Sequence, residues 1–196
     1  MQTERIISLI NNYNVPIFFF DEATTNEDYC HAIIIPSESL AEIRGIKKET
    51  TIEKNVGVHI FRCDEKTLYA DFLRRNLPAV YARQQQLQSC FSIEQSDIPL
   101  AFTLFTILHE IGHMIHIQES QLSHADYWFR NNASRDDVWK LYQFCNSAIC
   151  HTPQEKSLLL TFVNQIYDNI PSEKFANQFA EKEFEINWSL LKEGDK

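Results

Sequence analysis

Glycine and proline are scarce in this sequence, at 4 and 6 of 196 residues, which excludes fibrous and low-complexity proteins. Basic residues are also outnumbered, because 18 Lys and Arg stand against 27 Asp and Glu, for a net charge of −9. Without a cluster of Lys and Arg, direct binding to nucleic acid is not expected. The five cysteines form no C-x-x-C pair that would suggest a zinc knuckle or a redox couple, so we expect reduced thiols.

A secretory signal and a long apolar run are missing too. Near the start of the sequence, Glu4 and Arg5 precede a short apolar patch, where a signal peptide would have a basic start and a long apolar core. No uninterrupted apolar run approaches the roughly 18 residues needed to cross a bilayer. We therefore expect a cytoplasmic protein that makes no contact with a membrane.

Apolar residues make up 44% of the sequence, enough to bury one core, and we expect a single domain over residues 1–196. Patterns of β-branched, aromatic and apolar residues predict the following elements: a helix at 4–13, strands at 15–20, 31–35, 57–62 and 79–83, a buried helix at 99–117, a loop at 118–134, and helices at 135–144, 154–167 and 172–191. The predicted fold class is α+β, with a small antiparallel or mixed sheet packed against a helical layer.

The chemistry of the sequence centres on an H-E-x-x-H motif, His109-Glu110-Ile111-Gly112-His113, inside the predicted buried helix. Because a helix turns once in 3.6 residues, His109 and His113 lie on one face and their imidazoles can converge on one metal ion. Glu110 lies about 100° around the helix from His109, where it can reach a water in an open coordination position. The motif therefore predicts a Zn²⁺ site with Glu110 as general base.

A catalytic zinc ion normally takes three protein ligands, so a third donor is needed. The metzincin pattern H-E-x-x-H-x-x-G-x-x-H does not supply it, because His116 stands in place of its glycine and Glu119 in place of its last histidine. A second helix must then provide the ligand, and Glu173 is the best candidate. The alternative donors are Glu181 and Glu185 on the same helix and His124 in the predicted loop.

Two segments of the sequence together resemble the ImmA/IrrE zinc endopeptidases, in which a F-T-x-x-H-E-x-G-H helix pairs with a later E-x-x-A-N-x-F-A helix. Residues 105–113 match the first motif, and Glu173, Ala176, Asn177, Phe179 and Ala180 match the second in register. The helix-then-strand opening over residues 5–20 is also similar to the family's. The resemblance implies a zincin-like metallopeptidase domain with Glu173 as third zinc ligand. It also implies that Ala176 and Ala180 let the two helices approach closely.

The same resemblance implies a zinc-dependent endopeptidase that hydrolyses peptide bonds with metal-activated water. Family members commonly cleave helix-turn-helix transcriptional repressors, so such a repressor is the expected protein substrate. The predicted strand at 79–83 would align the substrate backbone by strand addition. The alternative is a non-catalytic, metal-stabilised binding module that sequesters a regulatory protein partner. A third hypothesis is that the protein uses the same metal chemistry to hydrolyse an amide other than a peptide bond.

About sixty residues separate His113 from Glu173, more than is usual in the family. We interpret residues 117–171 as a helical insertion that serves as a lid, a docking surface or a purely structural elaboration. Tyr127 and His124 lie in this segment and are weak candidates for stabilising the oxyanion, because no spacing supports them. The sequence favours no specific oxyanion-stabilising residue.

Overall fold

A small mixed sheet lies near the start of the chain in the computed structural model, which describes residues 6, 8–20, 30–33, 56–61, 64–75, 77–147 and 152–193. Its strands are β1 (Ile17–Phe20), β2 (Cys30–Ile33) and β3 (Gly57–Phe61), in the order β1–β3–β2. The central strand β3 runs parallel to β1 and antiparallel to β2. These strands correspond to the ones predicted at 15–20, 31–35 and 57–62, and β2 begins one residue earlier than predicted, at Cys30. Residues 34, 35 and 62 of the predicted strands lie outside the described residues.

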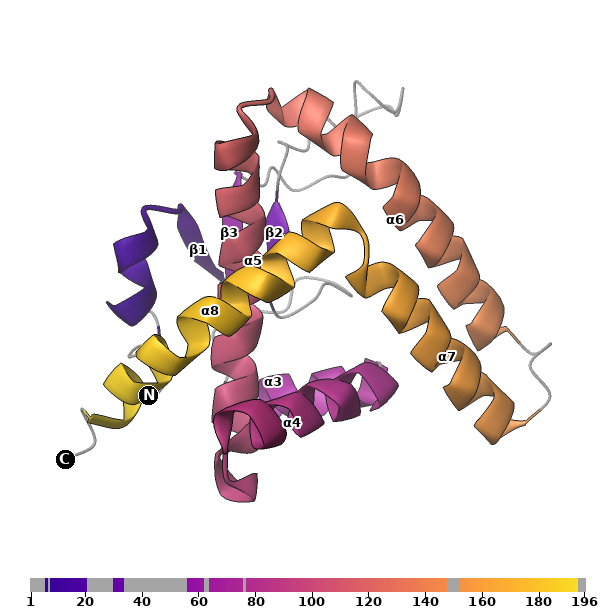
Figure 1. Cartoon of the computed structure of the whole chain (residues 1–196), viewed down its shortest axis with the longest axis horizontal. Coiled ribbons are helices and arrows are strands. Elements are labelled where there is room, and N and C mark those ends of the chain that lie inside the picture. The colour runs from indigo at the N-terminus through magenta and orange to yellow at the C-terminus, as the bar shows by residue number, and fades with distance from the viewer. Residues whose placement is uncertain are drawn as a thin grey trace.

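Helices make up most of the remaining described chain, which agrees with the α+β class at a coarse level. They are α3 (Glu65–Arg75), α4 (Leu77–Phe91), α5 (Ile98–Ser120), α6 (His124–Asn146), α7 (Pro153–Asp168) and α8 (Pro171–Glu193), with short 3-10 turns η1 (Asn11–Tyr13) and η2 (Gln95–Asp97). In Figure 1, α5 runs through the centre of the molecule, α8 crosses it on one side, and the sheet lies on the other. This arrangement makes α5 the helix on which the other elements pack.

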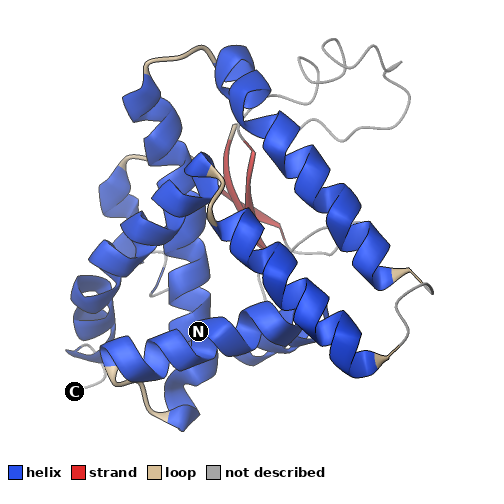
Figure 2. Ribbon diagram, turned by 45° about the vertical axis from the view of Figure 1, so that its right-hand side comes forward, coloured by secondary structure: helices blue, strands red, loops and turns tan. Residues whose placement is uncertain are grey.

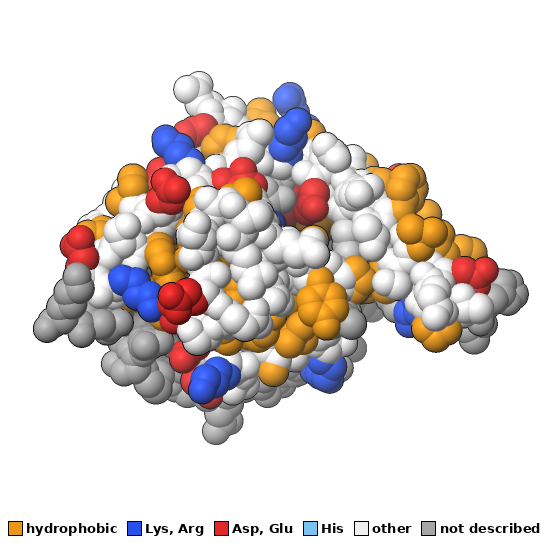
Figure 3. All heavy atoms as spheres, turned by 60° about the horizontal axis from the view of Figure 1, so that its bottom comes forward, with side chains coloured by type: hydrophobic (Ala, Val, Ile, Leu, Met, Phe, Trp, Pro, Cys, Tyr) orange, Lys and Arg blue, Asp and Glu red, His pale blue; other side chains and the backbone are white. Residues whose placement is uncertain are grey.

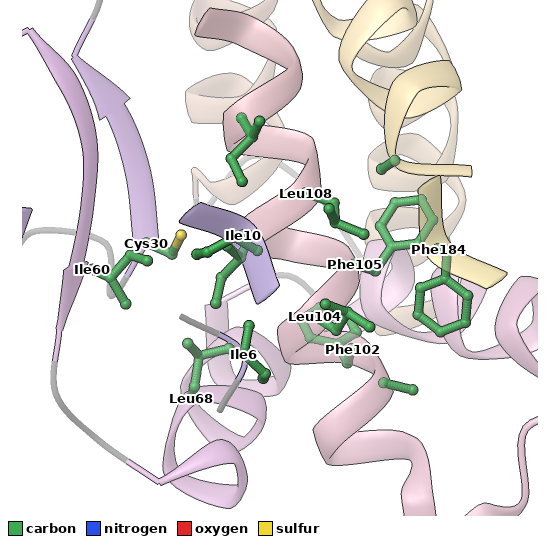
Figure 4. Close-up of a cluster of buried hydrophobic side chains, with 14 of the residues drawn as sticks. Ile6, Ile10, Cys30, Ile60, Leu68, Phe102, Leu104, Phe105, Leu108 and Phe184 are labelled. Atoms are coloured by element: carbon green, nitrogen blue, oxygen red, sulfur yellow. The ribbon is translucent and has the colours of Figure 1, made fainter. Parts of the chain in front are cut away.

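Helix α5 is buried because apolar side chains cover nearly its whole circumference between Leu100 and Leu108. Figure 4 shows Cys30 and Ile60 of the sheet on one side of this helix and Phe184 of α8 on the other. The helix ends at Ser120, and the following residue, Gln121, adopts a left-handed conformation with φ 55°. The core of the described chain is therefore built around the helix that carries the H-E-x-x-H motif.

The same helix is long and apolar enough, over Gln95–Ser120, to pass a test for membrane spans by length and composition. The sequence prediction of no membrane span was based on uninterrupted apolar runs. Helix α5 contains a few polar residues but still has a mean hydropathy high enough to pass the test. However, 72% of its most apolar window is buried inside the protein. That burial is what the central helix of a globular core requires.

Two of the predicted elements are wrong. The segment 79–83 lies inside α4 and not in a strand, because Ala, Arg, Gln and Leu favour a helix and Pro78 is tolerated in its first turn. It therefore cannot align a substrate by strand addition. The predicted loop at 118–134 is helical except at residues 121–123. Ser123 begins α6 as an N-cap, since its Oγ accepts a hydrogen bond of 3.1 Å from the Asp126 backbone N–H.

The segment 117–171, interpreted from the sequence as an insertion, consists mainly of α6 and α7, which form a helical hairpin with its own small hydrophobic core. That core contains Val138, Cys145, Leu160, Val163 and Ile170. It is separate from the larger cluster around α5. The pair projects away from β1 and the central helix (Figure 1), and the helical surroundings of the strands are visible in Figure 2. The hairpin is thus a second packing unit attached beside the main core.

Several large apolar side chains of this hairpin are exposed, namely Phe129, Trp139, Leu141, Phe144, Leu158, Leu159 and Phe162. Hydrophobic side chains gather on the projecting end at the right of Figure 3. A groove of about 650 Å³ between the two helices is lined by Leu141 and Phe162, among others. An apolar surface of this kind is unusual on a helix pair that faces only water.

Candidate metal centre

Helices α5 and α8 cross at Gly112, where small residues let their backbones come close. A Cβ atom at Gly112 would lie 2.8 Å from the Cα of Ala176 and 3.1 Å from its carbonyl oxygen. Ala176 and Ala180 are both fully buried in this contact region. The expected close approach is confirmed for Ala176. The sequence did not predict that its counterpart on α5 is the glycine of the H-E-x-x-H motif.

This crossing brings three potential metal ligands together. The Nε2 atoms of His109 and His113 are 3.1 Å apart, and each lies 3.3 Å from Oε2 of Glu173. Glu173, in the first turn of α8, is completely buried. His109 retains 17% of its side-chain exposure, whereas His113 retains 2%. The group is therefore buried on the α8 side and reachable by solvent at His109.

The spacing of these donors fits one metal ion. Ligand atoms 2.0–2.2 Å from a tetrahedral ion are separated from one another by about 3.3–3.6 Å. The three separations of 3.1, 3.3 and 3.3 Å come close to that range before any adjustment. Within the described ranges, His109, His113 and Glu173 form a group of donors that all lie within 4.8 Å of one another. This buried group could hold a metal ion.

The alternative third ligands are placed elsewhere. Glu181 and Glu185 of α8 and His124 at the start of α6 are all exposed, and none belongs to the donor group found in the described residues. Glu181 instead accepts a hydrogen bond of 2.6 Å from the amide of Gln86. Of the four candidates weighed from the sequence, only Glu173 reaches the two histidines.

Asn177 holds His109 in the orientation that metal binding requires. The Oδ1 atom of Asn177 accepts a hydrogen bond of 2.7 Å from Arg83 and lies 2.9 Å from Nδ1 of His109. Because arginine can only donate, this amide atom is an oxygen, and His109 must then carry its proton on Nδ1. The lone pair of Nε2 is left to face Glu173 and His113.

The same asparagine connects four helices around the site. Arg83 comes from α4 and stacks over the Phe105 ring of α5 at 3.9 Å from its centroid. The amide nitrogen of Asn177 donates to Asp168 at the end of α7, at 3.3 Å. The orientation of His109 is therefore supported by contacts that neither sequence motif contains.

Glu173 has a second set of contacts on its other oxygen. Arg135 of α6 forms an ion pair with Oε1 of Glu173 at an N···O distance of 2.6 Å, while Oε2 faces the two histidines. Arg135 also donates to the hydroxyl oxygen of Tyr167, on α7, at 3.3 Å. The α6–α7 hairpin thus contributes a cation that contacts a candidate ligand directly. No local pattern in the sequence predicts that contact.

The charges of these groups shift their pKa values in a consistent direction. Burial would raise the pKa of Glu173, but His113, His109 and Arg135 together hold it well below its ordinary value of 4.5. Burial would lower the pKa of His109, but Glu173 and Glu110 outweigh this effect and raise it above 6.5. Glu173 is therefore an ionised carboxylate at neutral pH, the form that binds metals.

Glu110 is half-buried and does not belong to the donor group. Its charge contributes to raising the pKa of His109, of Arg135 and of Tyr167. Its carboxylate is therefore close enough to these three groups to act on them electrostatically. This is the placement expected of a carboxylate beside the ligands, although its role as a base stays a prediction.

His116 and Tyr127 form a contact of their own, outside the donor group. The hydroxyl of Tyr127 lies 2.7 Å from Nδ1 of His116, whose ring stacks on Phe175 at 4.5 Å. Tyr127 is buried, and its burial raises its pKa to about 12. The tyrosine therefore serves the packing between α5, α6 and α8, and the exposed His124 has no part in the donor group.

No family model, curated protein or solved structure matches this chain. The resemblance to the ImmA/IrrE endopeptidases therefore depends on the two motifs and on the helix-then-strand opening of the sequence.

Proposed function

We propose that the chain is a zinc-dependent endopeptidase with a zincin-like fold, in which His109, His113 and Glu173 hold the ion. The observation that carries this proposal is the convergence of two imidazoles and one carboxylate next to a further carboxylate, Glu110, that is not a ligand. A structural zinc site is usually closed by four protein ligands. A group of three, reachable by solvent at His109, is typical of a catalytic site that keeps one position open.

Each side chain has a role in this proposal. A zinc ion held by His109, His113 and Glu173 would lower the pKa of a bound water to about 7 and would polarise the scissile carbonyl. The Glu110 carboxylate accepts a proton from the attacking water and delivers it to the nitrogen of the leaving amine. Asn177 keeps the Nδ1 proton of His109 directed away from the ion, so that Nε2 is available as a ligand.

The proposed substrate is a protein in the cytoplasm, and a helix-turn-helix transcriptional repressor fits best. The resemblance suggests this class of partner. The net charge of −9 supports it, because a DNA-binding protein carries a basic surface that an acidic enzyme attracts. Hydrolysis of a different amide would use the same groups, so the substrate has to be identified by experiment.

The non-catalytic alternative is favoured by a different observation, the exposed apolar side chains on α6 and α7. In this alternative a metal ion would only join α5 to α8, and the hairpin would sequester a regulatory protein. Glu110 distinguishes the two functions, because a metal that only joins helices has no use for a neighbouring base. The deciding variant is therefore Glu110→Gln.

The experiment compares the wild-type protein with Glu110→Gln and, as matched control, Glu119→Gln, which changes an exposed glutamate on the same helix. Zinc content is measured by elemental analysis, and new protein N-termini are identified by mass spectrometry in cells that express each variant. We expect similar zinc content in all three proteins. Loss of the base should reduce cleavage by about 10²- to 10⁴-fold in Glu110→Gln alone.

Two outcomes would contradict the proposal. If Glu110→Gln cleaves as fast as the wild type, Glu110 is not the base and the mechanism is wrong. If the zinc-loaded wild type generates no new N-termini, it is not an endopeptidase under these conditions. If the wild type and Glu110→Gln then bind the same partner protein equally well, the protein is a non-catalytic binding module.

A further inference from the structure

The two carboxylate oxygens of Glu173 have different partners, and one partner comes from the insertion. Oε2 faces the Nε2 atoms of His109 and His113, each at 3.3 Å. Oε1 is paired with the guanidinium of Arg135 at 2.6 Å. The carboxylate is completely buried, so neither oxygen can use water as a substitute partner.

This division matters because a carboxylate can bind a metal through one oxygen or through both. The terminal torsion of a glutamate is broad and roughly two-fold, so it does not fix the orientation by itself. A close ion pair with one oxygen, in a buried site, favours one orientation and keeps that oxygen beside the cation. With Oε1 held by Arg135, only Oε2 remains for an ion between the histidines.

The position of Arg135 is set by the hairpin and not by the helices that carry the ligands. Val138, one turn further along α6, belongs to the hairpin core together with Leu160 and Val163 of α7. The hydroxyl of Tyr167, also on α7, accepts a hydrogen bond of 3.3 Å from Arg135. Packing of the hairpin therefore determines where the guanidinium lies.

We propose that Arg135 is a positioning residue that makes Glu173 a one-oxygen metal ligand, so that the α6–α7 insertion completes the metal site. The proposal rests on the metal-binding part of the proposed function and does not depend on peptide hydrolysis. It assigns the 117–171 segment a direct part in the site, beyond a lid or a docking surface. Arg135 acts through Glu173, so its removal should change the metal site before it changes the chemistry.

The test compares Arg135→Ala and Arg135→Lys with the wild type, using Arg130→Ala as matched control because Arg130 is an exposed arginine of the same helix. Zinc affinity is measured by competition with a chromogenic chelator. Each protein is also loaded with Co²⁺, whose visible absorption weakens when four-coordination gives way to five-coordination. Circular dichroism of the metal-free proteins shows whether each variant folds.

We expect Arg135→Ala to lose about 10- to 100-fold in zinc affinity, as is usual when the partner of a ligand is removed. Its Co²⁺ spectrum should weaken, since both oxygens of Glu173 become available. Arg135→Lys retains the charge but not the planar fork, so it should give an intermediate affinity and partial recovery of the spectrum. Arg130→Ala should match the wild type in both measurements.

Several results would overturn the proposal. Unchanged zinc affinity and an unchanged Co²⁺ spectrum in a folded Arg135→Ala would show that the arginine does not position Glu173, while leaving the proposed function intact. Unchanged metal binding with lost cleavage would show that Arg135 acts on the substrate. If Arg135→Ala does not fold, Arg135→Lys decides, and a zinc affinity and a Co²⁺ spectrum there equal to those of the wild type would refute the need for a guanidinium beside Glu173. Absence of metal from the wild type would reject the positioning role together with the proposed function.

Discussion

Replacing Gly112 by alanine tests the packing that brings the two ligand-bearing helices together. In an isolated helix the change would stabilise the folded state by about 1 kcal/mol, because glycine is a poor helix former. Here the new methyl group would meet the Cα of Ala176 at 2.8 Å and the Cβ of Phe179 at 3.2 Å. Carbon atoms reach their best separation near 3.5–4.0 Å, so the helices would have to move apart by roughly 0.7 Å or more.

The energetic outcome follows from which atoms are crowded. Overpacking in a core costs about 1–3 kcal/mol, and the upper part of that range applies where backbone atoms cannot rotate away. The net loss of stability in Gly112→Ala should then be about 1–2 kcal/mol after the helix-propensity gain is subtracted. A site must hold its groups within about 0.5 Å, so the displacement should also weaken zinc binding by at least about 10-fold.

The assay is urea unfolding of the metal-free proteins in a chelator, followed by zinc titration of the folded ones. The double variant Gly112→Ala with Ala176→Gly serves as the internal control. Because the crowded atoms of Ala176 are its Cα and carbonyl oxygen, which glycine retains, the second change should not restore stability or affinity. The reasoning is refuted if Gly112→Ala equals the wild type in both measurements, or if Ala176→Gly rescues it.

Asn177→Ala should reduce zinc affinity about 10- to 100-fold, because His109 loses the acceptor that fixes its Nδ1 proton, whereas the exposed neighbour variant Gln178→Ala should leave it unchanged. Equal affinities in the two variants would contradict this role. In the metal-free protein, folding lowers the pKa of Glu173, so its charge stabilises the fold at pH values above its ordinary pKa of 4.5. Folding raises the pKa of His109, so its charge stabilises the fold at pH values below its ordinary pKa of 6.5. The stability lost on Glu173→Gln in the metal-free protein should therefore be largest between pH 4.5 and 6.5 and decline as the pH rises beyond it. Urea unfolding as a function of pH measures it, and a loss that grows steadily to pH 8 would be inconsistent with the pair. Zinc at a free concentration of 100 times its Kd should stabilise the wild type by about 2.7 kcal/mol, and thermal unfolding that does not respond to zinc would exclude a folded-state site.

The sequence alone was sufficient where helix geometry relates the residues. His109 and His113 are four residues apart, so one turn of helix puts them on one face whatever surrounds them. Glu173 is different, because its distance from that helix depends on how the chain packs. Its selection over the alternatives required a second motif in register, and the structure places it within 3.3 Å of both histidines.

The contacts that support the site could not be read from the sequence. Arg83 and Arg135 come from different helices, and they reach Asn177 and Glu173 only because of how α4 and α6 pack. Neither arginine belongs to a motif, and an isolated arginine is usually a surface residue. Gly112 was visible within the motif, but only the crossing of α5 with α8 shows that a side chain there would collide with Ala176.

The errors in the fold have equally local causes. The polar stretch at 118–134 was interpreted as a loop because most of its residues are hydrophilic. A helix with much of its surface in solvent has the same composition, and the Ser123 to Asp126 spacing was the capping signal that could have identified it. In α4, Val80 and Leu87 are buried seven residues apart, a helical spacing that extends beyond the five residues taken for a strand.

The separate hydrophobic cluster of α6 and α7 also bears on the order in which the chain folds. Contacts within the hairpin join residues that are near in sequence, so they can form early. Bringing α5 to α8 closes a loop of about sixty residues, and a preformed hairpin lowers the entropic cost of that step by replacing flexible chain with a rigid spacer. We expect the ligand-bearing helices to meet after the hairpin has formed. Zinc would then retard unfolding more than it accelerates folding.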